Sequence, residues 1–302
     1  MTAAIATAVF LSACSGFHQP SETALRREID RNIAQGQLAE ALALANRALS
    51  GSPEAPSPDR WTYRLLRAEI RLSDGQTSEA EAVVAEQVPS APEFASVRAR
   101  QKYVAGRLLV TTHRLEEAMQ VLDEAGRLAE VASDTRIALD AGVLQGRAAL
   151  QLARWDEGTA ILTNVVHRAR SSGDPYREAL ALNNLGMGWL VRSRFDEALP
   201  FFEQVLSTSG IGQLLVYSNA LNNAGICYAR LGEFDRAIDL QRRAVASHER
   251  RTARSYLEQA LGELGNTYIL RGDPAKAVPY LERALGVARA ARLQRPDKPG
   301  DR

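Results

Sequence analysis

One pattern returns about every 40 residues along most of this chain, and it restricts the possible folds more than any other feature. Its clearest copies read ALNNLGMGWLVRSRFDEALPFFEQVL, ALNNAGICYARLGEFDRAIDLQRRAV and ALGELGNTYILRGDPAKAVPYLERAL. One position, which we call the anchor, recurs at Ile29, Ala68, Gly106, Gly146, Gly186, Gly225 and Gly265. The separations are 39, 38, 40, 40, 39 and 40 residues. A register kept over seven copies predicts an array of structural repeats.

The residue types within each copy predict a pair of antiparallel helices. A second small residue follows the anchor after twelve positions, as at Ala198, Ala237 and Ala277. Two helices can approach closely only where the side chains between them are small. Glycines suited to a left-handed turn lie between the two helical segments at Gly36, Gly75, Gly232 and Gly272. Acidic residues such as Asp196 then suit the positive end of the second helix.

These residues resemble the signature of the tetratricopeptide repeat (TPR) from Leu25 to about Arg289. The resemblance implies an all-α, right-handed α-solenoid of about seven TPR-like helical hairpins, forming one quasi-linear domain over residues 25–290. The first helix of each hairpin is expected to line a concave groove. The period exceeds the usual repeat of roughly 34 residues. In this it is similar to the longer repeats of kinesin light chains and of peptide-sensing bacterial regulators.

The overall charge balance argues against some partners. Lys and Arg number 37 and Asp and Glu number 36, so no net field favours nucleic acid or an anionic membrane surface. Only two cysteines are present, Cys14 and Cys227, and disulfides are therefore not the expected stabiliser. Cys227 lies between Ile226 and Tyr228 in a strongly helical repeat, where we expect a small buried apolar residue.

The N-terminus suggests export and lipid attachment. An apolar run over residues 3–11 is too short to span a membrane and ends in Leu11-Ser12-Ala13-Cys14. This tetrapeptide resembles a bacterial lipobox. The resemblance implies a signal peptide over residues 1–13, lipidation at Cys14, a tether over 14–24 and a lipid-anchored, periplasm-facing location in the bacterial envelope. Ser15 resembles an outer-membrane address. The run lacks Lys and Arg, which departs from the pattern, and the alternative is an ordinary apolar N-terminus with a chance cysteine.

Two other segments look irregular. The sequence GSPEAPSPD after Ser50 is rich in proline and predicts a loop between the first two repeats. Residues 291–302 are polar and predict a disordered tail.

Nothing in the sequence predicts catalysis, a cofactor or a metal site. The histidines His18, His113, His167 and His248 lie far apart, and none has a carboxylate or cysteine at metal-ligand spacing, so we expect surface or turn residues. Gly186-Met187-Gly188 has neither the preceding strand nor the third glycine of a dinucleotide-binding loop. We therefore predict that the chain is not an enzyme and binds no cofactor.

A group of asparagines on the expected first helices is a candidate binding site. They are Asn183, Asn184, Asn219, Asn222, Asn223 and Asn266. Kinesin light chains carry a similar Leu-Asn-Asn-Leu string, and the resemblance implies that these amides hold the backbone of an extended peptide. The alternative is that they satisfy hydrogen bonds between helices.

Arginines on the same face form a second candidate site. Arg100, Arg107 and Arg147 could hold a carboxylate or an acidic peptide, or could pair with neighbouring acids such as Asp140. The apolar residues Met187, Leu190 and Ile226 could form the floor of the groove or belong to the core.

The leading hypothesis is a non-catalytic scaffold of the bacterial envelope that binds a partner protein or an extended peptide in its concave groove, without nucleic acid. Two alternatives remain. Because TPR arrays of this type often precede a CHAT caspase-like peptidase domain, the chain could be the sensing half of a split or truncated peptidase system. If the N-terminal run is not an export signal, it could be a cytoplasmic peptide sensor.

Overall fold

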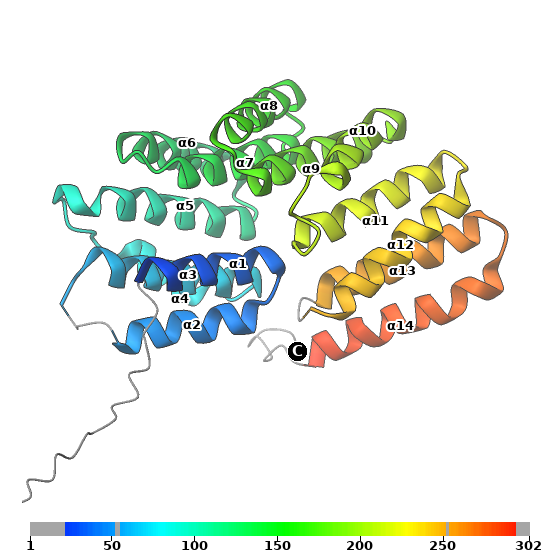
Figure 1. Cartoon of the computed structure of the whole chain (residues 1–302), viewed down its shortest axis with the longest axis horizontal. Helices are drawn as coiled ribbons and strands as arrows, with labels where there is room; N and C mark the ends of the chain where they lie inside the picture. The colour runs from blue at the N-terminus through cyan, green and yellow to red at the C-terminus, as the bar shows by residue number, and fades with distance from the viewer. Residues whose placement is uncertain (1–21, 52–54, 252–253, 294–302) are drawn as a thin grey trace, which may run out of the picture.

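The computed structural model describes residues 22–51, 55–251 and 254–293, and in this part of the chain every regular element is helical. The helices follow one another as antiparallel pairs (Figure 1), which confirms the predicted all-α array of about seven hairpins. Their bounds are α1 (Glu22–Gln35), α2 (Leu38–Gly51), α3 (Pro58–Ser73), α4 (Ser78–Ala85), η1 (Pro92–Phe94), α5 (Ala95–Thr111), α6 (Leu115–Val131), α7 (Thr135–Gln151), α8 (Trp155–Ser172), α9 (Pro175–Val191), α10 (Phe195–Ser207), α11 (Leu215–Arg230), α12 (Phe234–Glu249), α13 (Arg254–Leu270) and α14 (Pro274–Leu293).

The described residues differ slightly from the expected domain limits. Helix α1 begins at Glu22, within the expected tether, and α14 ends at Leu293, within the expected tail. The predicted signal peptide over residues 1–13 lies outside the described residues, as do Cys14 and His18 in the expected tether and residues 294–302. None of the described helices combines the length and the apolarity needed to cross a membrane.

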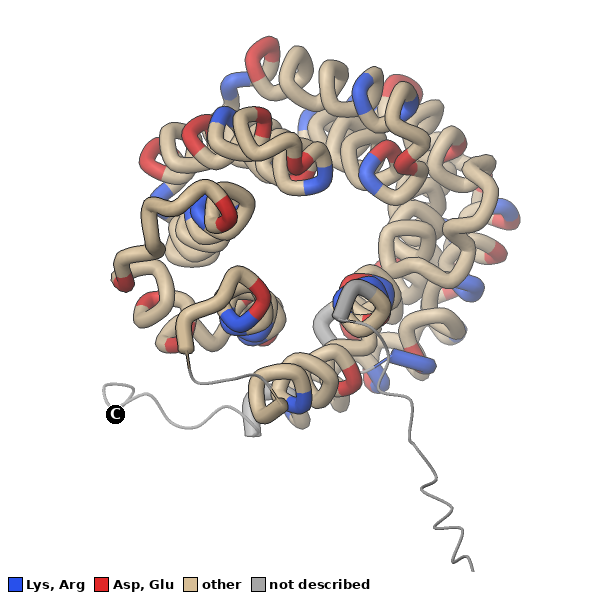
Figure 2. The backbone as a smooth tube through the Cα atoms, turned by 60° about the vertical axis from the view of Figure 1, so that its left-hand side comes forward, with Lys and Arg blue, Asp and Glu red and all other residues tan. Residues whose placement is uncertain are grey.

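The hairpins stack into a curved, two-layered array. From α3 to α13, each odd-numbered helix packs directly on the next odd-numbered one, and the even-numbered helices pack in between. The odd-numbered helices therefore form the inner layer and the even-numbered helices the outer layer, as α5 to α10 show in Figure 1. Figure 2 shows that the stack winds around a central axis. The inner side of this turn is the concave wall predicted for the first helices.

Close approach within the last five hairpins depends on the anchor glycines, as predicted. A Cβ atom added to Gly106 would lie 2.5 Å from the side chain of Leu122, and one added to Gly186 would lie 2.7 Å from the ring of Phe202. Real Cβ atoms do not tolerate such distances. The space is filled by the residue sixteen positions after the anchor, which the sequence pattern did not indicate. It is Leu122, Leu162, Phe202, Gln241 and Leu281 in the last five hairpins.

The turn inside every hairpin is left-handed at the same repeat position, seven residues after the anchor. Gly36, Gly75, Gly232 and Gly272 have positive φ there, which confirms their predicted role. The other three hairpins use His113, Ala153 and Ser193, whose φ angles are 59°, 59° and 57°. The hairpin geometry is therefore strong enough to impose this conformation on side chains that normally avoid it.

The first hairpin also contacts a distant part of the array. The Arg251 side chain, after α12, donates from Nε to the backbone carbonyl of Gln35 at 2.8 Å and from Nη2 to the carbonyl of Gln213 at 3.1 Å. A Cβ on Gly36 would lie 3.3 Å from Cδ of Arg251. Helix α1 thus meets the start of α11, and the superhelical turn closes on itself.

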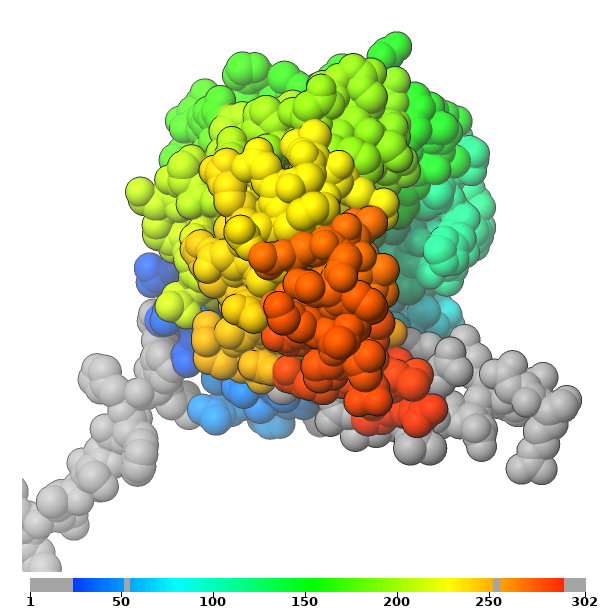
Figure 3. Space-filling view, turned by 90° about the vertical axis from the view of Figure 1, so that its right-hand side faces the viewer, coloured from blue at the N-terminus to red at the C-terminus, as the bar shows by residue number. Residues whose placement is uncertain are grey.

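The other end of the described array is less polar. Helices α13 and α14 form this end, which Figure 3 turns toward the viewer. Ile269, Leu270, Val278 and Leu285 in this hairpin are all about half exposed. The last described hairpin therefore exposes four large apolar side chains, whereas a capping repeat typically presents a polar outer face.

Candidate functional site

A single repeat position forms a line of side chains along the concave wall. The anchor faces the second helix of its hairpin, and the residue after it lies about 100° further around the first helix, toward the axis of the turn. We call this set the inner stripe. It consists of Asp30, Glu69, Arg107, Arg147, Met187, Ile226 and Asn266. The stripe passes from acidic to basic to apolar to polar residues along the array.

The first part of the inner stripe is occupied by buried ion pairs. Glu69 is almost fully buried, and its carboxylate accepts a hydrogen bond from Nη1 of Arg100 at 2.6 Å. Nη1 of Arg107 lies 3.6 Å from the other oxygen of Glu69, and its Nη2 donates to Ser73 at 3.1 Å. Burial raises the pKa of the Glu69 carboxyl, against the opposing charges of both arginines. Arg100 and Arg107 therefore pair with an acid, the alternative that the sequence left open.

Asp140 has a different partner from the one expected. It accepts a hydrogen bond from Nη2 of Arg177 at 2.7 Å, and Nη1 of Arg177 reaches Asp174 at 2.8 Å. Asp174 also accepts from the backbone N–H of Arg177 and so caps the N-terminus of α9. Burial would lower the pKa of Arg177, but the two carboxylates outweigh it and raise the pKa. This triad fixes α9 against α7.

Arg147 is the arginine that remains available. It is exposed, and no described residue forms a hydrogen bond or ion pair with it. The surrounding protein and the charge of Arg107 lower the pKa of its guanidinium. Of the three arginines predicted as a site, only Arg147 offers an unpaired charge to the concave side.

Four of the asparagines take part in packing to different degrees. Nδ2 of Asn223 donates to Oδ1 of Asn183 at 3.2 Å, and Nδ2 of Asn184 donates to the Leu180 carbonyl of its own helix at 2.7 Å. Asn222 is buried, and its Oδ1 has no partner among the described residues. Inter-helix bonding, the sequence alternative, thus accounts for the Asn183–Asn223 pair.

The other two asparagines are more accessible. Asn219 is half-buried, Asn266 is exposed, and neither forms a hydrogen bond with a described side chain or backbone group. Asn266 is the last member of the inner stripe, so its amide is free to face a ligand there.

A hollow of about 400 Å³ lies on the wall formed by α9, α11 and α13. Met187, Leu190, Phe195 and Ile226 give it an apolar floor, and its rim carries Ser193, Asn223, Arg230, Gln259 and Glu263. Met187 and Leu190 also pack against the core cluster around Phe202, so they serve both as core and as floor. This volume is within the range of ligand-binding clefts. The sequence left open whether Met187, Leu190 and Ile226 form a floor or belong to the core, and it did not indicate the charged rim residues Arg230 and Glu263.

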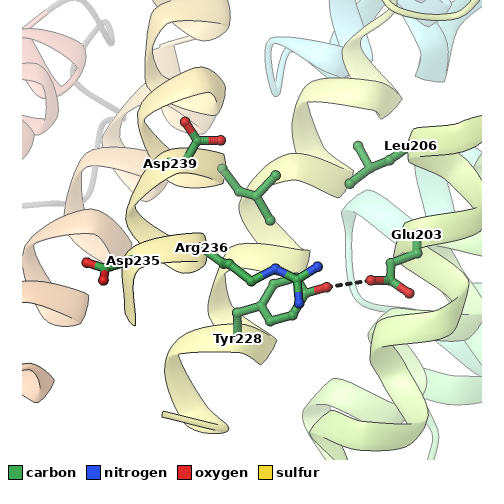
Figure 4. Close-up of a pocket in the computed structure, with 7 residues that line it drawn as sticks. Glu203, Leu206, Tyr228, Asp235, Arg236 and Asp239 are labelled. Carbon is green, nitrogen blue, oxygen red and sulfur yellow. Dashed lines mark hydrogen bonds between the residues drawn. The ribbon is translucent and has the colours of Figure 1, made fainter. Parts of the chain in front are cut away.

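A second hollow, of about 520 Å³, lies between α10, α11 and α12 (Figure 4). Three of its polar groups contact one another, and its other two, Asp235 and Asp239, form ion pairs with Arg271 and Arg243. The Tyr228 hydroxyl donates to Glu203, and the Arg236 guanidinium lies 4.3 Å from the centre of the Tyr228 ring. Burial and the hydrogen bond to Glu203 raise the pKa of Tyr228 to about 12. Because these groups satisfy one another, this surface has a structural explanation.

The histidines only partly follow expectation. His113 is a turn residue and His167 is exposed, but His248 is 1% exposed, so predicting it at the surface or in a turn was wrong. It lies in the last turn of α12, where its ring stacks on Tyr256 at 5.8 Å. Within the described ranges, no three His, Cys, Asp or Glu side chains are placed to hold a metal ion. Cys227 is fully buried, as predicted, and burial raises its pKa to about 12.

Comparisons with known proteins agree with this geometry. Models described as tetratricopeptide repeat match residues 27–93, 143–213 and 216–290, together well over half of the chain. A comparison with curated protein sequences finds no match.

Solved structures also resemble the array. BtubC (BKLC) from P. vanneervenii is 20% identical, covering 88% of this chain and 96% of its own, with a TM-score of 0.55. The apo form of RapI is 16% identical, covering 89% and 77%, with a TM-score of 0.58. The apo quorum sensor NprR from B. thuringiensis is 14% identical, covering 89% and 78%, with a TM-score of 0.58. At these identities the likeness concerns the fold alone.

Proposed function

Because the chain belongs to the tetratricopeptide repeat family, we propose that it is a non-catalytic scaffold that binds an extended peptide, or an extended segment of a partner protein, on its concave wall. The hollow between α9, α11 and α13 carries this proposal. An apolar floor can receive one large side chain, while amides and charges at the rim can hold the backbone and neighbouring polar groups.

The state of the rim supports binding over a purely structural role. Arg230 and Glu263 face the same hollow, yet neither forms an ion pair with a described residue. In the hollow between α10, α11 and α12, by contrast, every charged side chain has a partner, either within the hollow or in a neighbouring arginine. An apolar floor with unpaired charges at its rim resembles a protein-binding surface, in which an apolar centre is surrounded by polar groups.

Selection of a phage-displayed library of random peptides on the purified protein tests this function. We expect enriched peptides whose affinity, measured by fluorescence anisotropy, falls about tenfold or more in Ile226→Glu, because a carboxylate would occupy the apolar floor. Asn164→Glu places the same charge on the exposed side of α8 and serves as the matched control. Failure to enrich any peptide, or equal binding by both variants, would contradict groove binding.

We further propose that the scaffold is held at the bacterial envelope, facing the periplasm, by acylation of Cys14. The lipobox-like Leu11-Ser12-Ala13-Cys14 supports this location. Fractionation of the tagged full-length protein beside Cys14→Ala, with intact mass analysis for the lipid, is the test. Membrane recovery that requires Cys14 is expected, and soluble recovery of both forms would exclude the anchor.

A second candidate function is peptide sensing in the cytoplasm. It draws support from the similar fold of NprR, whose structure is described as that of a quorum sensor. The two candidates share the groove and differ in location, so the Cys14 experiment separates them.

A further inference from the structure

The cluster of charged side chains around Arg107 and Arg147 on the concave wall leaves one arginine without a carboxylate partner. Four arginines and three carboxylates meet where α3, α5, α7 and α9 form the wall. They are Arg100, Arg107, Arg147 and Arg177 with Glu69, Asp140 and Asp174. Four positive groups face three negative ones within this set, and the adjoining Asp30 and Asp134 are balanced by Arg136 and Arg26, so one net positive charge remains. Because the other three arginines each contact a carboxylate, this charge resides on Arg147.

The surroundings of Arg147 supply further hydrogen-bond donors. Tyr103 on α5 and Tyr256 on α13 lie within electrostatic reach of its guanidinium. Tyr103 is half-buried with the Arg107 guanidinium 5.9 Å from its ring centre, and its hydroxyl has no hydrogen-bond partner in the described part of the chain. Burial raises the pKa of Tyr103 to about 12, so its hydroxyl stays protonated and can donate. These groups suit an anionic acceptor.

The position of Arg147 in the repeat relates it to the apolar hollow. Arg147, Met187 and Ile226 are consecutive members of the inner stripe, on α7, α9 and α11. Neighbouring packed helices lie about 10 Å apart. The hollow between α9 and α11 is therefore roughly 15 Å from Arg147 along the wall. An extended chain rises about 3.3 Å per residue, so this distance corresponds to about three to five residues.

We propose that Arg147 and Tyr103 recognise an acidic side chain of the bound peptide, about three to five residues from the large apolar side chain that fills the hollow. This inference rests on the proposed groove function and names the sequence that the groove selects. Stripe positions continue on both sides of Arg147, so a ligand lying along the wall passes this point as a continuous chain. It therefore presents a side-chain carboxylate there, as opposed to its C-terminus.

The test is a second selection of the random peptide library on Arg147→Glu beside the wild-type protein. We expect Asp or Glu at the predicted spacing from an apolar residue in the wild-type pool, and Lys or Arg at that position in the Arg147→Glu pool. A wild-type peptide should lose about tenfold or more in affinity for Arg147→Gln, and changing its acid to Gln should then cost little more. Arg127→Gln, on the exposed side of α6, is the control for a lost arginine.

The possible failures are distinguishable. Peptides that depend on Ile226 but show no acidic preference, or that bind Arg147→Gln unchanged, overturn this inference and leave the groove function standing. A requirement for a free C-terminal carboxylate, detected by amidating synthetic peptides, overturns the side-chain assignment. Loss of all binding in Ile226→Glu together with loss of the acidic preference in Arg147→Glu supports both. Because Arg147 has no partner, its variants should retain the wild-type melting temperature.

Discussion

At the scale of single residues, His248 connects the packing of the array to pH. It is buried beside Arg251, and its Nδ1 has no hydrogen-bond partner in the described structure. Burial is the main cause that lowers the pKa of His248 from 6.5 to about 4, and the positive charge of Arg251 is the smaller one. The folded protein therefore holds this imidazole neutral at pH values where the unfolded chain protonates it.

The sign of the resulting pH dependence follows from proton binding. Between pH 6.5 and 4 the unfolded state carries the extra proton, so the free energy of unfolding falls as the pH falls through this window. At pH 5 the loss from His248 is about 2 kcal/mol. Urea unfolding of wild-type protein and His248→Phe at pH 7.5 and pH 5 measures it. The variant should lose less stability on acidification, whereas the exposed His167→Phe should behave as the wild type does. Equal losses in all three would refute the assignment.

The sequence predicted which face of the helix Arg107 and Arg147 occupy, but not whether each side chain forms an ion pair. Repeat register placed Arg107 and Arg147 in equivalent positions, because a fixed period fixes which side of a helix a residue occupies. Whether an arginine is paired depends on residues from other repeats, such as Glu69, 38 residues before Arg107. Those contacts depend on the packing angle between hairpins, which the period does not specify. His248 was misjudged for the same reason, since α13 covers it.

At the scale of the helix pair, one hairpin departs from the packing rule of the others. The residue facing the anchor glycine is Leu162 in the fourth hairpin and Phe202 in the fifth, but Gln241 in the sixth. Gln241 is fully buried, and neither atom of its amide has a hydrogen-bond partner among the described residues. A buried amide without partners costs about 1–3 kcal/mol.

We therefore expect Gln241→Leu to raise the free energy of unfolding by about 1–2 kcal/mol, since leucine has similar size and no polar atoms to desolvate. Urea unfolding followed by circular dichroism measures the change. The reverse substitution at the equivalent position, Leu162→Gln, is the matched comparison and should be destabilising. A destabilised Gln241→Leu would show that the amide has a partner, such as a bound water, that the hairpin needs.

The helical hairpins were the part of the structure that the sequence predicted best. Small residues at the anchor and twelve positions later, together with turn glycines, specify a tight hairpin because each has a local physical cause. Left-handed turns at His113, Ala153 and Ser193 were not predicted, because these residues do not favour that conformation on their own. There the pairing of the two helices decides the turn, and only the repeat position of Gly36 and Gly232 pointed to it.

At the scale of the whole molecule, seven hairpins bring the first repeat beside the sixth. Arg251 donates hydrogen bonds to the carbonyls of Gln35 and Gln213, and Gly36 packs against the aliphatic part of its side chain. On the same side, Asp30 of α1 pairs with Arg136 of α7 at 2.7 Å. The sequence predicted a superhelix but not this closure, because contacts between residues 216 positions apart depend on the summed twist of every intervening hairpin.

The first hairpin meets the sixth repeat through only a few polar contacts. We expect this interface to open more readily than the other helix contacts, because interfaces with little apolar burial are the least stable. The hydrogen bond from Arg251 to Gln35 is the one that spans the closure, and losing it should favour opening by roughly 1–2 kcal/mol, or about tenfold. In Arg251→Ala we expect faster amide hydrogen exchange in α1 and a larger radius of gyration by X-ray scattering, with the exchange of α7 unchanged. Arg250→Ala, its exposed neighbour, is the control. If α1 exchanges as slowly in Arg251→Ala as in the control, then packing of Ile29 against α2 and α3 holds the first hairpin in place without the closure.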